Sequence, residues 1–330
     1  MKHIASLLLT LALTLSLAAC AAPREKADDG KLQIVATLFP YYDFARAIAG
    51  DRADVTLLLS PGREAHSFEP TPLDAVTISE SDVFLYNGGE GEYWVDEMLA
   101  AAGEHIAVTA RMMDYVDALD EEFSEGMQGA DSHDHDDHSH DDHDHEDEHD
   151  SDEVEYDEHI WTSPKNAVVL CRAVCDAICG ADPANEDFYR ANCDAYCAQL
   201  EALDARFASL CESAPRKLLV FADRFPMLYF CREYGLDYRA AFHGCSGDTE
   251  PSLTTIKYLI DKVEDEHIPV VYTVDLSTKK VAAVVSECTG AAVDTLYSMQ
   301  TVSRADLDAG ETYLTLMERN YEALRKGLNE

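Results

Sequence analysis

Residues 182–215 have the sequence DPANEDFYRANCDAYCAQLEALDARFASLCESAP. Asp182 and Pro183 provide a helix start, and Pro215 provides an end. Between them, apolar residues follow alternating spacings of four and three, the period of an amphipathic helix: Tyr196, Leu200, Leu203, Phe207 and Leu210. At 1.5 Å per residue, roughly 30 residues make a helix of about 45 Å. This length predicts one stiff linking helix over 182–214 that braces two lobes and permits small tilts rather than wide closure.

Short apolar strands alternate with helical stretches on both sides of this helix, a pattern typical of βαβ units with mostly parallel sheets. In the first lobe, 32–181, we expect helices from near Tyr41, Leu73 and Tyr93 and strands at 32–39, 55–60, 82–88 and 105–109. In the second lobe, 215–330, we expect helices from near Phe225, Leu253, Lys279 and Asp306 and strands at 216–222, 236–242, 270–275 and 291–296. The predicted fold is α/β, with two (β/α) lobes joined by the long helix.

The N-terminus indicates export. Lys2 precedes an apolar stretch from Ile4 to Leu17, and small residues lead to Cys20. The stretch is too short to span a bilayer comfortably, and no later segment reaches about 18 apolar residues. It resembles a bacterial lipobox, which implies a signal peptide over 1–19, a lipid on Cys20 and a polar tether over 20–31. The alternative is a plain signal peptide with an incidental cysteine.

The composition limits the possible partners. Of 330 residues, 64 are acidic and 25 are Lys or Arg, so the formal net charge is −39. Such a chain repels nucleic acid and anionic membrane surfaces at long range. With 47% hydrophobic residues it can still bury a sizeable core. Cationic ligands are therefore the natural partners.

Residues 120–158 differ in kind from the rest. They hold 20 acidic residues, no Lys or Arg, and seven histidines: His133, His135, His138, His140, His143, His145 and His149. We expect a disordered loop, because so many like charges cannot pack without counter-ions. A solvated acidic loop would have no need of imidazole, which suits zinc, copper and nickel. The loop is therefore predicted to collect metal ions weakly, while selectivity comes from the folded lobes.

Nine cysteines follow Cys20, an odd number that cannot pair completely within the chain. Their spacing of four residues in two sets predicts that each set lies along one face of a helix: Cys171, Cys175 and Cys179, then Cys193 and Cys197. No CxxC pair occurs. Three interpretations stay open: small buried hydrophobes, one or two disulfides between adjacent helices, or a thiolate metal site.

Two histidines outside the loop are candidate ligands. His66 lies in PGREAHSFEPTP, 61–72, after a predicted strand, where ligands bind in open α/β sheets. His159 lies in DEHIWTSP, 157–164, where order is expected to resume and a helix to start near Ser163.

The chain resembles the solute-binding lipoproteins of zinc and manganese ABC transporters, sometimes called cluster A-I. The resemblance covers nearly everything from Leu32 onward. It is carried by VATLFPYYDFARAIAG at 35–50, the two histidine motifs, FADRFPMLYFCREYGL at 221–236 and GAAVDTL at 290–296. It implies a metal in the interlobe cleft, with His66 and His159 as its first two ligands.

The resemblance leaves the second-lobe ligands open. The family's third ligand position falls on Ala222, and alanine cannot coordinate. His243 is the best substitute by residue type. Asp294 is the closest match to the fourth ligand and Asp275 competes with it. Glu250 would orient a ligand from outside the coordination sphere.

The function that this implies is an extracytoplasmic receptor, a monomer tethered by lipid to the outer face of the cytoplasmic membrane. It would capture Zn²⁺ and deliver it to an ABC permease. Mn²⁺ is the alternative cargo, although two histidines favour zinc. A zinc hydrolase has no support from HExxH, GxSxG or a phosphate loop, so we expect no enzyme. A surface adhesin or a metal buffer that binds through the loop alone is the remaining alternative.

Overall fold

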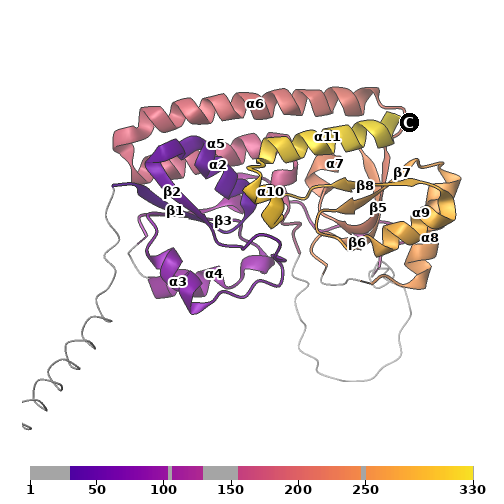
Figure 1. Ribbon diagram of the computed structural model, residues 1–330, viewed down its shortest axis with the longest axis horizontal. Coiled ribbons are helices and arrows are strands. Elements are labelled where there is room, and N and C mark those ends of the chain that lie inside the picture. The colour runs from indigo at the N-terminus through magenta and orange to yellow at the C-terminus, as the bar shows by residue number, and fades with distance from the viewer. Residues whose placement is uncertain (1–29, 103–105, 129–154, 247–249, 330) are drawn as a thin grey trace, which may run out of the picture. The chain divides into compact units, whose positions relative to one another are not determined.

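The computed structural model describes residues 30–102, 106–128, 155–246 and 250–329. Within Leu32–Glu330, which packs as one unit, the strands form two parallel four-stranded sheets (Figure 1). The first has the order β2-β1-β3-β4, with β1 Leu32–Ala36, β2 Ala53–Leu57, β3 Val83–Tyr86 and β4 Val108–Arg111. The second has the order β6-β5-β7-β8, with β5 Leu218–Phe225, β6 Asp237–His243, β7 Val270–Val274 and β8 Ala292–Leu296. The predicted α/β fold with two parallel sheets is confirmed.

Helices cover both sheets. In the first lobe they are α2 Phe39–Ala49, α3 Pro72–Ser79, α4 Val95–Ala102 and α5 Pro164–Ala181. In the second lobe they are α7 Leu228–Tyr234, α8 Leu253–Asp265, α9 Lys280–Thr289, α10 Arg304–Asp308 and α11 Tyr313–Asn329. The last helical stretch was predicted from near Asp306 as one helix, but Gly310, with a φ of 77°, separates α10 from α11. None of the described helices is long and apolar enough to cross a membrane.

The long helix α6, Glu186–Ser213, runs along both lobes (Figure 1). It contacts α2 of the first lobe and α7 and α11 of the second. A buried hydrogen bond of 2.7 Å from the hydroxyl of Tyr196 to Asp43 ties it to α2. The helix begins four residues later than its predicted start at Asp182, because Pro183–Asn185 form a 3-10 turn instead. The predicted brace is confirmed.

Two local departures shape the site. The register of β5 against β6 shifts between Phe221 and Arg224, so β5 continues past its predicted end at residue 222, and α7 begins after Phe225. The expected disordered loop is also too wide at both ends. Residues 120–128 and 155–158 are folded, and Asp120 and Tyr156 form an antiparallel bridge. The two segments flank the acidic loop and pair with each other, so their backbone N–H and C=O groups are hydrogen-bonded where the composition predicted disorder.

Candidate metal site

Two imidazoles from the first lobe meet at one cavity. His66 lies in the loop between β2 and α3, and His159 caps the 3-10 turn Ile160–Thr162 that precedes α5. Their ring centroids are 5.5 Å apart with an interplanar angle of 60°. Both line a cavity of about 330 Å³, together with Ala222 and Asp275 of the second lobe. The two ligands expected from the resemblance thus lie together where the lobes meet.

Asp157 determines the orientation of His159. Its Oδ1 accepts a hydrogen bond of 2.8 Å from the backbone N–H of His159 and lies 3.0 Å from the ring Nδ1. Because an ionised carboxylate only accepts, Nδ1 carries the proton and Nε2 keeps its lone pair. Burial lowers the pKa of His159, but the charge and hydrogen bond of Asp157 outweigh it, and the pKa is raised. The ring is therefore held ready to coordinate through Nε2.

His66 has a different electrostatic setting. Its Nε2 lies 3.1 Å from the side-chain nitrogen of Gln300, a residue of the loop after β8. Burial, followed by the charge of His159, lowers the pKa of His66 to about 4. The ring is thus neutral at pH 7, the form that binds metal. A metal at His66 Nε2 has to replace the Gln300 amide.

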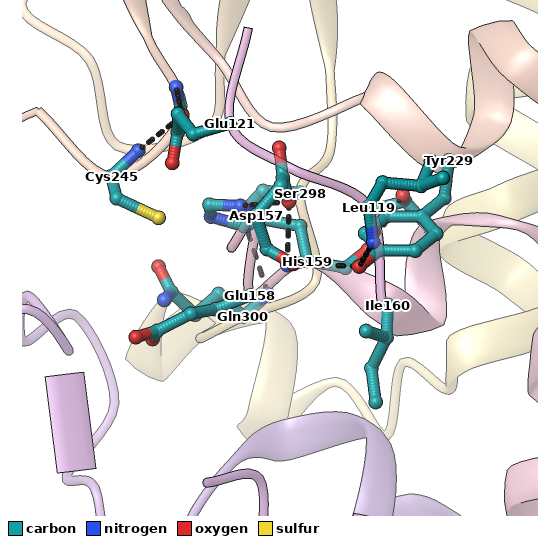
Figure 2. Close-up of polar contacts among 12 residues, drawn as sticks. Leu119, Glu121, Asp157, Glu158, His159, Ile160, Tyr229, Cys245, Ser298 and Gln300 are labelled. Carbon is teal, nitrogen blue, oxygen red and sulfur yellow. Dashed lines mark hydrogen bonds and ion pairs between the residues drawn. The ribbon is translucent and has the colours of Figure 1, made fainter. Parts of the chain in front are cut away.

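A buried carboxylate, Glu121, lies beside the two imidazoles. Its Oε1 accepts hydrogen bonds from the backbone of Gly244, at 2.8 Å, and of Cys245, at 3.4 Å (Figure 2). Its Oε2 is buried and has no hydrogen-bond partner. Burial raises the pKa of Glu121, but hydrogen bonds from His243 and Cys245 outweigh this and lower it to about 2. An ionised, buried carboxylate oxygen without a hydrogen-bond partner is available to coordinate a cation.

Cys245 adds a thiol to the same place. It follows β6, and Figure 2 shows its sulfur directed toward the space between His159 and Gln300. Its backbone N–H donates the hydrogen bond of 3.4 Å to Oε1 of Glu121. Burial, followed by the charge of Glu121, raises the pKa of Cys245. The thiol is therefore protonated without a metal, and a bound cation would favour the thiolate.

The predicted second-lobe ligands lie in different places. Asp275 lines the cavity, where its Oδ1 accepts the Ser298 N–H at 2.7 Å and burial raises its pKa to about 6. His243 faces Glu121, with 3.1 Å between its Nδ1 and Oε1. Asp294 is not brought to the cavity. It forms an ion pair of 3.4 Å with Lys326 of α11, because it lies in the middle of β8, whereas the cavity is lined by Ser298 and Gln300 beyond the end of that strand.

Glu250 is exposed at the surface. Cys20 and the loop histidines lie outside the described residues: His133, His135, His138, His140, His143, His145 and His149.

Four residues of the site were missed from the sequence: Glu121, Asp157, Cys245 and Gln300. Asp157 stands in the quoted motif DEHIWTSP but was given no role. Glu121 was counted with the acidic loop because its composition matches that of its neighbours. Cys245 was grouped with the other cysteines, although its position three residues after a predicted strand end is a signal for a site residue. Gln300 carries no sequence signal, since it lies in an irregular loop.

Comparison with known proteins identifies relatives of the chain. Residues 34–327 match the family described as "Zinc-uptake complex component A periplasmic". The chain is 32% identical over 330 residues to the zinc-binding lipoprotein AdcA of Streptococcus pneumoniae, covering 99% of this chain and 61% of that protein. It is 29% identical over 301 residues to the high-affinity zinc uptake system protein ZnuA of Bacillus subtilis, covering 90% of this chain and 88% of that one.

Solved structures agree with this fold. The Zn(II)-bound ZnuA-like domain of S. pneumoniae AdcA superimposes with a TM-score of 0.72 at 27% identity, covering 91% of this chain and all of that domain. The metal-dependent lipoprotein YcdH of B. subtilis gives a TM-score of 0.73 at 28% identity, covering 90% and 100%.

Proposed function

Because this chain belongs to the family of periplasmic zinc-uptake complex component A, we propose that it is an extracytoplasmic receptor that captures Zn²⁺ and delivers it to an ABC-type permease. The observation that carries the proposal is the meeting of His66 and His159 at the interlobe cavity, 5.5 Å between ring centroids. Both rings can present a neutral nitrogen, and imidazole is a preferred zinc ligand. A substrate-binding role without catalysis is consistent with this arrangement.

We further propose that Cys245 and Glu121 complete the ligand set in place of the missing side chain at Ala222. The charge of Glu121 acts on both His66 and His159, and its buried Oε2 has no partner. Two nitrogens, a sulfur and a carboxylate oxygen are the donor types of a four-coordinate zinc site. No three of these donors lie within 4.8 Å of one another among the described residues. Binding therefore requires side-chain rotations, including release of His66 from Gln300.

The donor chemistry favours zinc over manganese. Thiolate and imidazole are soft or borderline ligands that suit Zn²⁺, whereas Mn²⁺ prefers carboxylate, carbonyl and water oxygens. Asp275 lines the same cavity and is the remaining candidate for a carboxylate ligand. The thiol of Cys245 is therefore a chemical reason to prefer Zn²⁺ over Mn²⁺ as the captured ion.

The receptor role also needs a permease, an anchor and a supply of ions. We propose that lipid on Cys20 holds the protein at the outer face of the cytoplasmic membrane. The histidine-rich loop raises the local zinc concentration by weak binding. The packing of α6 against both lobes favours local rearrangement at the cavity, rather than wide opening, for release to the permease.

The test is a zinc titration in competition with a chelator under reducing conditions. The full chain and a variant lacking residues 131–150 are compared, each with and without His66→Ala. One tight site should persist after loop removal and disappear with His66→Ala. His267→Asn, at an exposed histidine distant from the cavity, is the matched control and should leave the tight site unchanged. Loss of all binding on loop removal would show that the lobes are only a scaffold for the loop.

A further inference from the structure

Five cysteines lie face to face between α5 and α6. All are at most 6% exposed, and they come from one face of each helix: Cys171, Cys175, Cys179, Cys193 and Cys197. The two helices pack along each other (Figure 1). The sulfurs of Cys171, Cys193 and Cys197 all lie within 4.8 Å of one another. They are the one set of three potential metal-binding atoms at this spacing among the described residues.

The spacing of these sulfurs is that of a coordinated set. The Sγ atoms of Cys193 and Cys197 are 3.9 Å apart. Four sulfurs arranged tetrahedrally at about 2.3 Å from a metal ion are about 3.8 Å from one another. A disulfide would require about 2.05 Å, and the described cysteines are free thiols. A cation would therefore fit between these thiols with little movement of the helices.

A fourth donor is at hand. Cys175, one turn after Cys171 on α5, is buried at the same helix interface, although its sulfur lies outside the set whose atoms are all within 4.8 Å of one another. A side-chain rotation would bring it to the fourth coordinating position. The pattern is thus two residues four apart on each of two packed helices, named here the thiol cluster: Cys171, Cys175, Cys193 and Cys197. Cys179 lies at its edge, with 4.0 Å between its sulfur and that of Cys175.

A cationic side chain, Arg172, accompanies the thiol cluster. The guanidinium of Arg172 lies close enough for the charge of Cys197 to raise its pKa. Arg172 is held in place by ion pairs to Asp194, at 3.3 Å, and to Glu201, at 3.6 Å. A positive group beside the cluster offsets part of the negative charge that bound thiolates would carry.

We propose that the thiol cluster binds one soft, thiophilic cation of the class of Zn²⁺ or Cu⁺, at a closed site distinct from the interlobe cavity. Each coordinating thiol loses its proton to solvent as its bond to the metal forms, and no electron is transferred. Because the site is buried and all its positions are filled by sulfur, the ion is structural and is acquired as the chain folds. The bound ion cross-links α5 to α6, and α6 packs against both lobes.

The test uses Cd²⁺ as a spectroscopic probe of thiolate ligation. The full chain is unfolded under reducing conditions and refolded with and without Cd²⁺. The sulfur-to-cadmium charge-transfer absorption is then recorded, to which imidazole and carboxylate ligands do not contribute. We expect a strong band in the parent protein and a large loss of its intensity in Cys193→Ser, where only the single Cys245 thiolate of the interlobe site still contributes. Cys211→Ser, a buried cysteine on the same helix outside the cluster, is the matched control and should retain the band.

A cadmium NMR signal makes the test independent of whether the variant folds. In the unsubstituted protein the interlobe site offers one thiol, Cys245. A chemical shift typical of three or four sulfur ligands can therefore come only from a cysteine cluster. A shift typical of one sulfur or none, a band of undiminished intensity in Cys193→Ser, or a disulfide within the cluster by mass spectrometry would each overturn the proposal.

Discussion

The Nε2 of His66 lies 3.1 Å from the side-chain nitrogen of Gln300, so an amide from the second lobe occupies the coordinating position of a first-lobe histidine. Both residues line the interlobe cavity. In a receptor, this contact is the one that a captured cation has to displace. It connects metal capture to a change at the interface of the two lobes.

Gln300→Glu should increase zinc affinity. The variant replaces an amide with a carboxylate of nearly the same shape next to His66, which adds an anionic oxygen donor. We expect the dissociation constant to fall by about tenfold, which corresponds to about 1.4 kcal/mol. The measurement is chelator competition, and Gln199→Glu on the exposed face of α6 is the control for added negative charge. Unchanged affinity would place the metal away from His66.

Asp157→Asn should weaken zinc binding without unfolding the site. The carboxylate orients His159 through contacts at 2.8 and 3.0 Å, and such orienting partners are worth about 10 to 100-fold in metal affinity. Asp114→Asn, at an exposed position, is the control. Equal affinity in the two variants would mean that His159 does not coordinate.

Cys245→Ser should reduce zinc affinity and also the preference for zinc over manganese. A hydroxyl is a harder and weaker donor than a thiolate, so the loss for Zn²⁺ should exceed the loss for Mn²⁺. Titrations with both ions measure the change in the ratio. Cys288→Ser, at an exposed cysteine, serves as the control. A parallel loss for both ions would indicate a structural role for Cys245.

Zinc affinity should fall with decreasing pH, beginning above the ordinary histidine range. The pKa of His159 is raised above its usual value of about 6.5, because Asp157 outweighs the effect of burial. A proton therefore competes with the metal at His159 before it does at His66, whose pKa is lowered to about 4. Titrations between about pH 5 and 8 of the chain lacking 131–150 measure this dependence. A flat profile would exclude coordination by His159.

The metal-free protein should respond to pH in the opposite direction. Since the folded state raises the pKa of His159, the protonated ring stabilises it. That contribution is complete below about pH 6.5 and is lost as pH rises through the folded-state pKa. The difference in unfolding free energy between the unsubstituted protein and His159→Ala should therefore be largest below about pH 6.5 and should decrease as pH rises through the folded-state pKa. Saturating zinc should reverse the trend, because its binding requires the neutral ring.

Tyr196→Phe should destabilise the junction between the helices. The hydroxyl of Tyr196 donates to buried Asp43 at 2.7 Å, and Asp43 also accepts the backbone N–H of Tyr313 at 2.9 Å. Removing one donor leaves a buried carboxylate undersatisfied, at a cost of about 1 to 3 kcal/mol in unfolding free energy. Denaturant unfolding measures the change. Tyr93→Phe, 72% exposed, should change stability by less than about 0.5 kcal/mol.

The fold was accessible from the sequence because its signals are periodic. The eight strands within the described residues and the long helix follow from alternating apolar runs and from the spacing of Tyr196, Leu200 and Leu203. The errors occur where periodicity ends. Helix α6 begins later than predicted because Pro183 begins a 3-10 turn. Strand β5 ends later than predicted, with a register shift between Phe221 and Arg224.

The sequence alone also determined the type of chemistry: an acidic chain with two motif histidines, His66 and His159, and a run of cysteines at helical spacing. Only the tertiary structure decided which groups face them. Glu121, Cys245 and Gln300 come from three separate connecting segments, and Asp294 is turned away toward Lys326. Loop conformation depends on contacts between residues distant in the chain, and no local pattern encodes those contacts.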